Sequence, residues 1–267
     1  MERTQNAIKK ARGQRSTKKR AHISPNSEAS DDAWRALRRF TPAAAQLKHA
    51  RIITSGLDPA QVSVDILRTR LLQQMRRSGW TKLMVTSAGS GCGKSTTCVN
   101  LAISIARQPE MRTILLDFDL RAPSLANIFG YRSAIGTASV LEGRKSFADH
   151  AVCIGSNLAV CMGTEISQSP AESLLNRRTH DLIAQIEETY APDLMIFDMP
   201  PIYSNDDTAA LAPAVDCALA IVAAEETKMS EIDSCERDLA AITNVAGLVV
   251  NKCRFPELGQ GSTDPSY

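Results

Sequence analysis

A short apolar strand that runs into a glycine-rich loop and a Lys-Ser pair constrains this chain more than any other feature. The residues are Lys82-Leu83-Met84-Val85-Thr86-Ser87-Ala88-Gly89-Ser90-Gly91-Cys92-Gly93-Lys94-Ser95-Thr96. Glycines have no Cβ and reach positive φ, so consecutive backbone N–H groups can turn inward around phosphate oxygens. A helix that begins near Lys94 would add the positive end of its dipole. The pattern predicts a site for a nucleoside triphosphate, bound by the residues from Gly89 to Thr96.

Two side chains of this loop carry the expected chemistry. Lys94 would supply a mobile positive charge to the β and γ phosphates, and Ser95 would offer its hydroxyl to Mg²⁺. The first glycine of the G-x-x-x-x-G-K-[ST] pattern is Ala88 here, so the match is to the relaxed form. A glycine-rich turn without a ligand is the alternative. The buried strand before the loop and the helical spacing of residues 99–106 favour the nucleotide site.

Strands and helices alternate along the chain and predict an α/β fold. We expect strands at 81–87, 112–118, 157–162, 193–198, 217–223 and 246–251. We expect helices at 61–78, 94–107, 123–129, 170–190, 206–214 and 229–243. The strands are continuous apolar runs, which is typical of a mostly parallel sheet covered by helices on both faces, as in P-loop NTPases. A ligand of such a sheet binds at the carboxyl ends of its strands.

Acidic residues follow two of the predicted strands. Asp117 and Asp119 end one apolar strand, and Asp198 ends another before a pair of prolines. The carboxyl ends of parallel strands gather beside the phosphate loop, so all three could reach a Mg²⁺ held by Ser95 and the phosphates. One acid would then remain to orient or deprotonate a nucleophile. For any single one of them, a helix cap or a solvated turn residue is the alternative interpretation.

The charge is distributed unevenly between the start of the chain and the rest. Residues 1–51 contain 13 Lys and Arg against 4 Asp and Glu, whereas the remaining residues contain 18 against 25. Residues 1–50 are therefore expected to form a basic, largely disordered arm, with a short helix possible at 31–40. The ATPase domain would span 51–254, followed by a short flexible tail at 255–267. The arm could bind an anionic membrane surface, bind nucleic acid, or be a solvated tail.

Cysteine content and hydropathy suggest where the protein works. The seven cysteines show no C-x-x-C spacing, and several lie within predicted elements, which fits a reducing cytoplasm. The longest apolar candidate, residues 211–224, is too short to span a bilayer and contains Asp216. The basic N-terminal region has no apolar segment typical of a secretory signal. We expect a cytoplasmic protein, peripheral at the inner face of the membrane.

Several motifs together resemble the bacterial tyrosine kinases, cytoplasmic ATPase domains that regulate capsule and exopolysaccharide synthesis. The resemblance covers about residues 50–254. It is carried by the segments Ser87 to Thr96, Asp117-Phe118-Asp119-Leu120-Arg121-Ala122-Pro123, Phe129-Gly130, Ser169-Pro170-Ala171-Glu172-Ser173-Leu174-Leu175, and Asp198-Met199-Pro200-Pro201 with Asp207. The nucleotide motifs are shared with partitioning and septum-positioning ATPases. Partitioning ATPases carry a signature lysine where this chain has Gly89, which favours the polysaccharide group.

The resemblance implies a role for each matching residue. Lys94 would bind phosphate, Ser95 and Asp119 would bind Mg²⁺, and Asp198 would hold it through water. Asp117 would be the base for a tyrosine hydroxyl, so Asp117 and Lys94 are the expected catalytic residues. Asn251 would meet the adenine edge of ATP, with a turn residue at a strand end as the alternative.

Two regions of the chain depart from the family pattern. The kinases end in a cluster of tyrosines, whereas residues 256–267 contain only Tyr267. The helix before the first strand carries Glu-x-x-Arg-x-x-Arg in the kinases, for ring assembly, but Val62, Asp65 and Arg68 stand there in this chain. These departures leave autophosphorylation, the phosphate acceptor and the oligomeric state open.

Three functions compete at this point. The favoured hypothesis is an ATP- and Mg²⁺-dependent protein tyrosine kinase of exopolysaccharide or capsule biosynthesis, whose partner is a membrane polysaccharide co-polymerase or chain-length protein. The alternative is a regulatory ATPase that acts as a switch without kinase output, and that self-associates or docks to a membrane protein according to the bound nucleotide. A partitioning-type ATPase whose arm binds DNA is the third hypothesis, and Gly89 disfavours it together with nucleic-acid binding.

Overall fold

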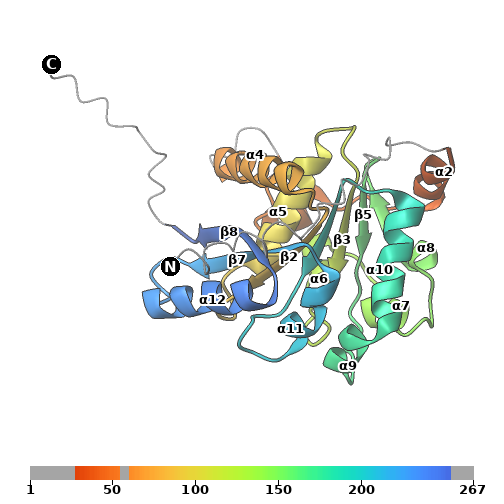
Figure 1. Cartoon of the computed structure of the whole chain (residues 1–267). Helices are drawn as coiled ribbons and strands as arrows, with labels where there is room; N and C mark the ends of the chain where they lie inside the picture. The colour runs from red at the N-terminus through yellow and green to blue at the C-terminus, as the bar shows by residue number, and fades with distance from the viewer. Residues whose placement is uncertain (1–27, 55–59, 254–267) are drawn as a thin grey trace, which may run out of the picture.

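The computed structural model describes residues 28–54 and 60–253, which form a sheet between two layers of helices (Figure 1). The sheet has eight strands in the order β1-β4-β5-β3-β6-β2-β7-β8. They are β1 (Arg38–Arg39), β2 (Lys82–Ser87), β3 (Thr113–Asp117), β4 (Val152–Ile154), β5 (Leu158–Cys161), β6 (Leu194–Asp198), β7 (Cys217–Ala223) and β8 (Asn244–Asn251). From β5 to β8 all neighbours pair in parallel, and β4 runs antiparallel to β5.

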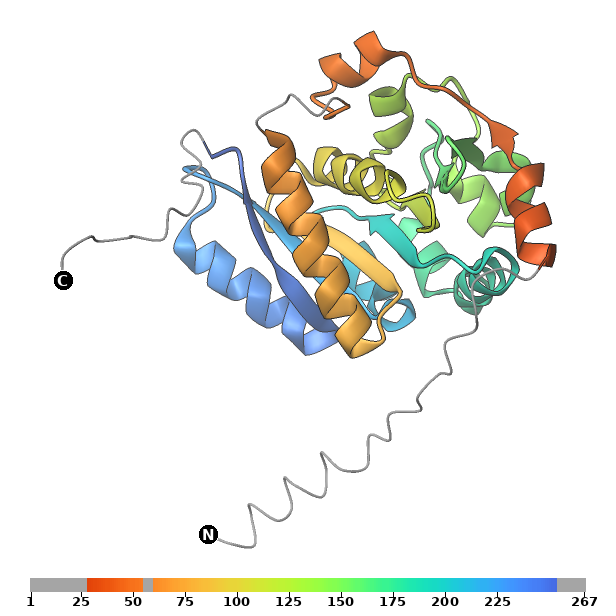
Figure 2. The same ribbon diagram turned by 90° about the horizontal axis from the view of Figure 1, so that it is seen from above.

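The helices cover both faces of the sheet, as Figure 2 shows from above. On one face lie α3 (Ala44–His49), α4 (Ala60–Ser78), α5 (Lys94–Ala106) and α6 (Leu125–Phe129). On the other lie α2 (Glu28–Ala36), α7 (Thr137–Leu141), α8 (Phe147–His150), α9 (Pro170–Leu175), α10 (Arg177–Tyr190), α11 (Asp207–Leu211) with the 3₁₀ turn Ala212–Ala214, and α12 (Met229–Ile242). All residues of β3, β5, β6 and β7 are buried, so the prediction of a parallel sheet with two covered faces is confirmed.

The segment before residue 50 differs from the expected disordered arm. Residues 28–50 form α2, β1 and α3, and β1 extends the sheet by pairing with β4. Trp34 of α2 is 2% exposed, and its indole Nε1 donates to the carbonyl oxygen of Tyr190 at 2.8 Å. The two rings also meet edge to face. The prediction of disorder was therefore wrong for residues 28–50, because a buried tryptophan anchors the segment. The short helix that the sequence made possible at 31–40 is present as α2. The more basic residues 1–27 and the tail 254–267 lie outside the described residues.

The other differences concern short elements. The helix expected at 170–190 is two helices, because Asn176 has an extended backbone between α9 and α10 and its side chain accepts from the N–H of Arg178. Strands β1 and β4 and helices α3, α7 and α8 were missed. Each spans two to six residues, too few to show a period in the sequence. No helix of the described residues is long and apolar enough to cross a membrane.

The first prediction concerns the N-terminal helix. Trp34→Ala should lower the free energy of unfolding by about 3–5 kcal/mol, because it removes a large buried ring. Trp34→Phe should lower it by only about 1 kcal/mol, since a buried aromatic ring remains and the hydrogen bond from the indole N–H to Tyr190 is lost. Urea unfolding followed by circular dichroism measures both. Equal stability of wild type and Trp34→Ala would show that α2 contributes nothing to the folded domain.

Candidate functional site

The phosphate loop joins β2 to α5 at the carboxyl edge of the sheet. Gly91 and Gly93 have φ of 75° and 89°, in the region that favours glycine, and α5 begins at Lys94 directly after them. The Ser87 hydroxyl donates to the carbonyl oxygen of Gly89 at 2.6 Å and stabilises the turn out of the strand. The loop therefore has the left-handed turns and the helix N-terminus that phosphate binding requires.

Asn251 touches this loop from the end of β8. Its side-chain Nδ2 donates to the carbonyl oxygen of Cys92 at 2.8 Å. A Cβ at Gly93 would lie only 2.2 Å from that nitrogen, so any other residue at position 93 would displace the Asn251 amide from Cys92. The sequence predicted that Asn251 meets adenine. The structure places it over the loop, with its amide nitrogen bonded to the backbone, and the adenine contact stays a prediction.

Two buried acids face each other behind the loop. Asp117 of β3 pairs in register with Asp198 of β6, and the side chains are 1% and 0% exposed. Asp117 accepts two backbone N–H groups through Oδ2, from Ser124 at 3.0 Å and Leu125 at 2.9 Å. Its Oδ1 and the Oδ2 of Asp198 have no hydrogen-bond partner among the described residues. Buried carboxylate oxygens without a donor are costly, so this pair suits a ligand that brings positive charge.

The protonation of these acids follows from the burial. Burial raises the pKa of Asp198 to about 6, although the Ser95 hydroxyl and the Lys94 ammonium oppose the change. Burial, and then the neighbouring Asp198, raise the pKa of Asp117 well above its usual range. Burial also raises the pKa of Asp119, with Lys94 acting in the opposite direction. A bound cation would lower all three values, since it favours the ionised carboxylates.

The remaining predicted ligands lie around the same edge. Lys94 is 8% exposed and lies close enough to act on Asp119 and Asp198. Within the described residues, no three Asp, Glu, His or Cys side chains form a complete metal cage. Mg²⁺ usually keeps waters and phosphate oxygens as ligands and takes one or two carboxylates, so Ser95, Asp119 and Asp198 fit such a partial set.

The loop after β3 is tied to the start of α11 by a contact that the motifs alone did not reveal. Arg121 donates to both carboxylate oxygens of Asp207, from Nε at 2.8 Å and from a terminal nitrogen at 2.9 Å. Asp207 is fully buried. The thiol of Cys98 on α5 is a second missed contact, and it donates to Asp198 at 3.6 Å. Neither has a spacing signal in the sequence, because the two residues of each contact lie 86 or 100 positions apart in the chain.

Helix α4 carries the positions that depart from the assembly pattern. The Arg68 guanidinium points inward, where it donates to Asp65 at 3.1 Å and to the Ser104 hydroxyl of α5 at 3.0 Å. Arg107 also contacts Asp65. The arginine that survives from the pattern therefore joins α4 to α5 in this structure, while Val62 is 49% exposed.

Comparisons with known proteins agree with this geometry. The ParA family, described as NUBPL iron-transfer P-loop NTPase, matches residues 80–257. Tyrosine-protein kinase YwqD of Bacillus subtilis is 31% identical over 172 residues, which cover 63% of this chain and 71% of that protein. Several other curated relatives are much longer, and the match spans 26% of tyrosine-protein kinase Wzc of Salmonella typhi.

Solved structures show the same architecture. The kinase domain of Escherichia coli tyrosine kinase ETK matches with a TM-score of 0.68 at 21% identity, over 86% of this chain and 97% of that one. The fold and the loop with its strand-end acids define a P-loop NTPase of the ParA group. Within that group, the chain belongs to the bacterial tyrosine-kinase family.

The second prediction tests the shape of the loop. Gly93→Ala should abolish measurable ATP binding, because the new methyl group would overlap the Asn251 amide and the φ of 89° strains any other residue. Isothermal titration calorimetry measures the affinity. Gly79→Ala is the matched control, since Gly79 has a φ of 71° but no atom within 4 Å of a Cβ. The control should lose about 1 kcal/mol of stability and bind ATP normally. Normal ATP binding by Gly93→Ala would contradict the described loop.

The third prediction concerns Asp65 and acid. Burial raises the pKa of Asp65, but the Ser104 hydroxyl, the Gln61 amide and the two arginines outweigh it, and the pKa lies below its ordinary value. The contribution of Asp65 is therefore complete above the unfolded pKa of about 4 and is lost as the pH falls through the folded value. Asp65→Asn should cost about 1–3 kcal/mol at pH 7. The difference in free energy of unfolding between wild type and Asp65→Asn should become smaller in acid, as measured by urea unfolding across pH. A difference that stays constant below pH 4 would refute the pairing of Asp65 with the arginines.

Proposed function

We propose that this protein is an ATP-dependent protein tyrosine kinase whose reaction takes place between the phosphate loop and the paired acids. The observation that carries the proposal is the pair of buried carboxyl groups, Asp117 and Asp198, each with an oxygen that has no partner in the described residues. Membership of the bacterial tyrosine-kinase family supports it. The chain spans only about a quarter of the length of several relatives. The activity and partners of those longer proteins are therefore proposals for this chain.

Each residue has a part in the proposed reaction. The loop N–H groups and Lys94 bind the phosphates, and Ser95, Asp119 and Asp198 hold Mg²⁺. When bound, Mg²⁺ supplies positive charge to the phosphate oxygens. The tyrosine oxygen forms a bond to the γ phosphorus, the bond from that phosphorus to the β–γ bridging oxygen breaks, and ADP leaves. Asp117 takes the hydroxyl proton through the oxygen that has no hydrogen-bond partner.

The proposed acceptor is Tyr267 or a tyrosine of a partner. Among the described residues, Tyr190 is 4% exposed and lies in the core, and Tyr131 is partly buried against Phe40 and Arg38. Tyr203 is half exposed, but its hydroxyl donates to Asp238 at 2.9 Å. This small set of tyrosines also favours a second candidate, a nucleotide-operated switch in which ATP controls self-association or docking without phosphoryl transfer.

The proposed context is the control of exopolysaccharide or capsule biosynthesis at the inner face of the membrane. The proposed partner is a membrane polysaccharide co-polymerase or chain-length protein, and self-association is a further proposal. The excess of Lys and Arg in residues 1–27 supports attachment to anionic lipid, because each basic residue near such a surface contributes about 1 kcal/mol.

The fourth prediction separates the roles of two residues. Lys94→Met should abolish ATP binding and phosphotyrosine formation, because it removes the charge that binds the phosphates. Asp117→Asn should still bind ATP but slow phosphoryl transfer by at least about a hundredfold, since an amide accepts no proton. Calorimetry measures binding, and mass spectrometry of the protein expressed with its neighbouring membrane protein measures phosphotyrosine. Lys145→Met, at an exposed position, is the control and should behave as wild type.

The outcomes distinguish the two candidates. Phosphotyrosine on Tyr267 or on the membrane protein, lost in both variants, supports the kinase. ATP binding by wild type without any phosphotyrosine would contradict the kinase. If ATP then changed the binding of the membrane protein in wild type but not in Lys94→Met, the switch would be the function.

A further inference from the structure

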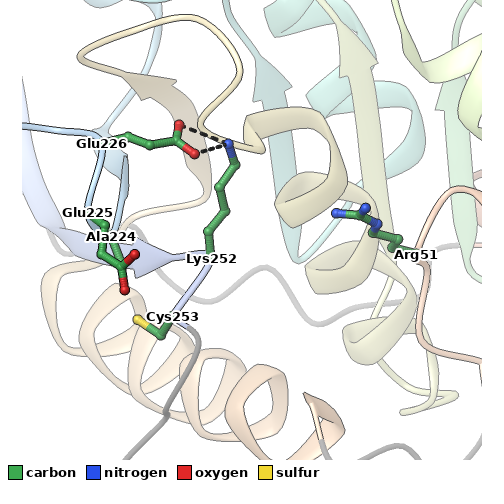
Figure 3. Close-up of a pocket in the computed structure, with 6 residues that line it drawn as sticks. All are labelled: Arg51, Ala224, Glu225, Glu226, Lys252 and Cys253. Atoms are coloured by element: carbon green, nitrogen blue, oxygen red, sulfur yellow. Dashed lines mark hydrogen bonds and ion pairs between the residues drawn. The ribbon is translucent and has the colours of Figure 1, made fainter.

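A cavity of about 520 Å³ lies where the ends of β7 and β8 approach the segment after α3 (Figure 3). It is lined by Arg51, Ala224, Glu225, Glu226, Lys252 and Cys253. Its size is within the range of sites that hold small molecules. None of these six residues belongs to the sequence motifs or to the predicted site.

The cavity adjoins the phosphate loop through Asn251. The N–H of Ala224, which lines the cavity, donates to the carbonyl oxygen of Asn251 at 2.8 Å. The side chain of the same asparagine donates to Cys92 inside the loop. Asn251 thus connects the cavity to the phosphate loop, and we expect the ribose and base of a nucleotide bound there to lie on this side.

Unusual backbone conformations concentrate around the cavity. In the described part of the chain, four residues other than glycine have a φ in the left-handed region. Three of the four line this cavity: Arg51 at 59°, Glu225 at 63° and Lys252 at 61°. Such conformations are unfavourable for residues with a side chain, and they concentrate at ligand sites, where surrounding contacts maintain them.

The contacts that maintain Arg51 come from two helices. At the end of α3, the N–H of Arg51 donates to the carbonyl oxygen of Lys48 at 3.0 Å. The other contacts come from α5, the helix that the phosphate loop precedes. The Asn100 side chain accepts from the N–H of Ile53 at 2.8 Å and donates to the carbonyl oxygen of Arg51 at 3.3 Å. Ile52 between them is 4% exposed. The backbone of Arg51 is thus held against the helix that begins with Lys94, at a fixed place relative to the loop.

The cavity has cationic groups on two sides. Lys252 donates to both carboxylate oxygens of Glu226, at 2.9 and 3.0 Å, so its charge is already compensated. Figure 3 shows the Arg51 side chain entering from the opposite side, toward this ion pair. A guanidinium is planar and weakly hydrated, and it stacks on flat aromatic rings such as nucleobases.

We propose that Arg51 is a nucleotide-binding residue that stacks its guanidinium on the base of the bound nucleoside triphosphate, opposite the Lys252–Glu226 pair. The proposal rests on the proposed function, since it needs a nucleotide in the phosphate loop. The segment before α4 would then contribute a residue directly to the nucleotide-binding site. Arg51 would then contribute to affinity for the nucleoside and not to affinity for the phosphates.

Two probes separate these contributions. Calorimetry with ATP and with inorganic tripolyphosphate, both with Mg²⁺, is carried out on the full chain. Arg51→Ala should weaken ATP binding about tenfold and leave tripolyphosphate binding unchanged, because only ATP carries a base. Arg51→Lys should weaken ATP binding nearly as much, since it keeps the charge but loses the planar group. Lys48→Ala, an exposed cation of α3 that does not line the cavity, is the control.

A further variant separates binding from folding. Arg51→Gly should raise the thermal unfolding temperature, because glycine accepts a φ of 59°, and should still weaken ATP binding.

Unchanged ATP affinity in Arg51→Ala would overturn the proposal, as would equal weakening of ATP and tripolyphosphate binding. Lys94→Met tests the proposed function separately. If it left ATP binding intact, the phosphate site would be wrong, whatever the Arg51 variants showed.

Discussion

Parallel alignment of the three central strands is the constraint on which the site depends. Asp198 at the end of β6 is in register with Asp117 of β3 on one side and with Val85 of β2 on the other. Parallel strands end at the same edge, so this register places the acids directly behind the loop that leaves β2. The packing of the fully buried strands fixes that register, because a slip by one residue would exchange the side chains between the two packed faces, where their shapes would not fit.

The site is electrostatically incomplete without a ligand. Two carboxyl groups are buried side by side, and each has an oxygen that no donor satisfies among the described residues. Burial raises the pKa of both, and Asp198 adds to the effect on Asp117. A bound cation would make this arrangement favourable, because it would offset the cost of burying the ionised carboxylates. This is the physical basis of the proposed Mg²⁺-nucleotide site.

The segment before α4 completes the domain at two places. Its first helix inserts Trp34 beside Tyr190, and β1 pairs with β4 at the edge of the sheet. Near its end, the Asn100 side chain hydrogen-bonds to the backbone of Arg51 and Ile53. Arg51 lines the cavity beside Asn251. The segment therefore contacts the core on one face of the sheet and lines the cavity beside Asn251 on the other.

The sequence by itself determined the α/β class, the phosphate loop, the acids at two strand ends and the main strands. These features are local: a glycine pattern, an apolar run or a helical period is visible within fewer than twenty residues. The sequence indicated a possible helix at 31–40, but it could not reveal that α2, β1 and α3 pack onto the domain. Their partners, such as Asn127, Cys153 and Tyr190, lie 81 to 156 residues away in the chain.

Only the tertiary structure decided which side chains meet. It placed Asn251 over Cys92, paired Arg121 with Asp207, turned Arg68 inward to α5 and brought Arg51 to the cavity. Each of these contacts joins elements that are separate in the chain, so no spacing in the sequence could encode it. The physical reason is that local propensity selects the elements, whereas burial and strand register decide how they pack against one another.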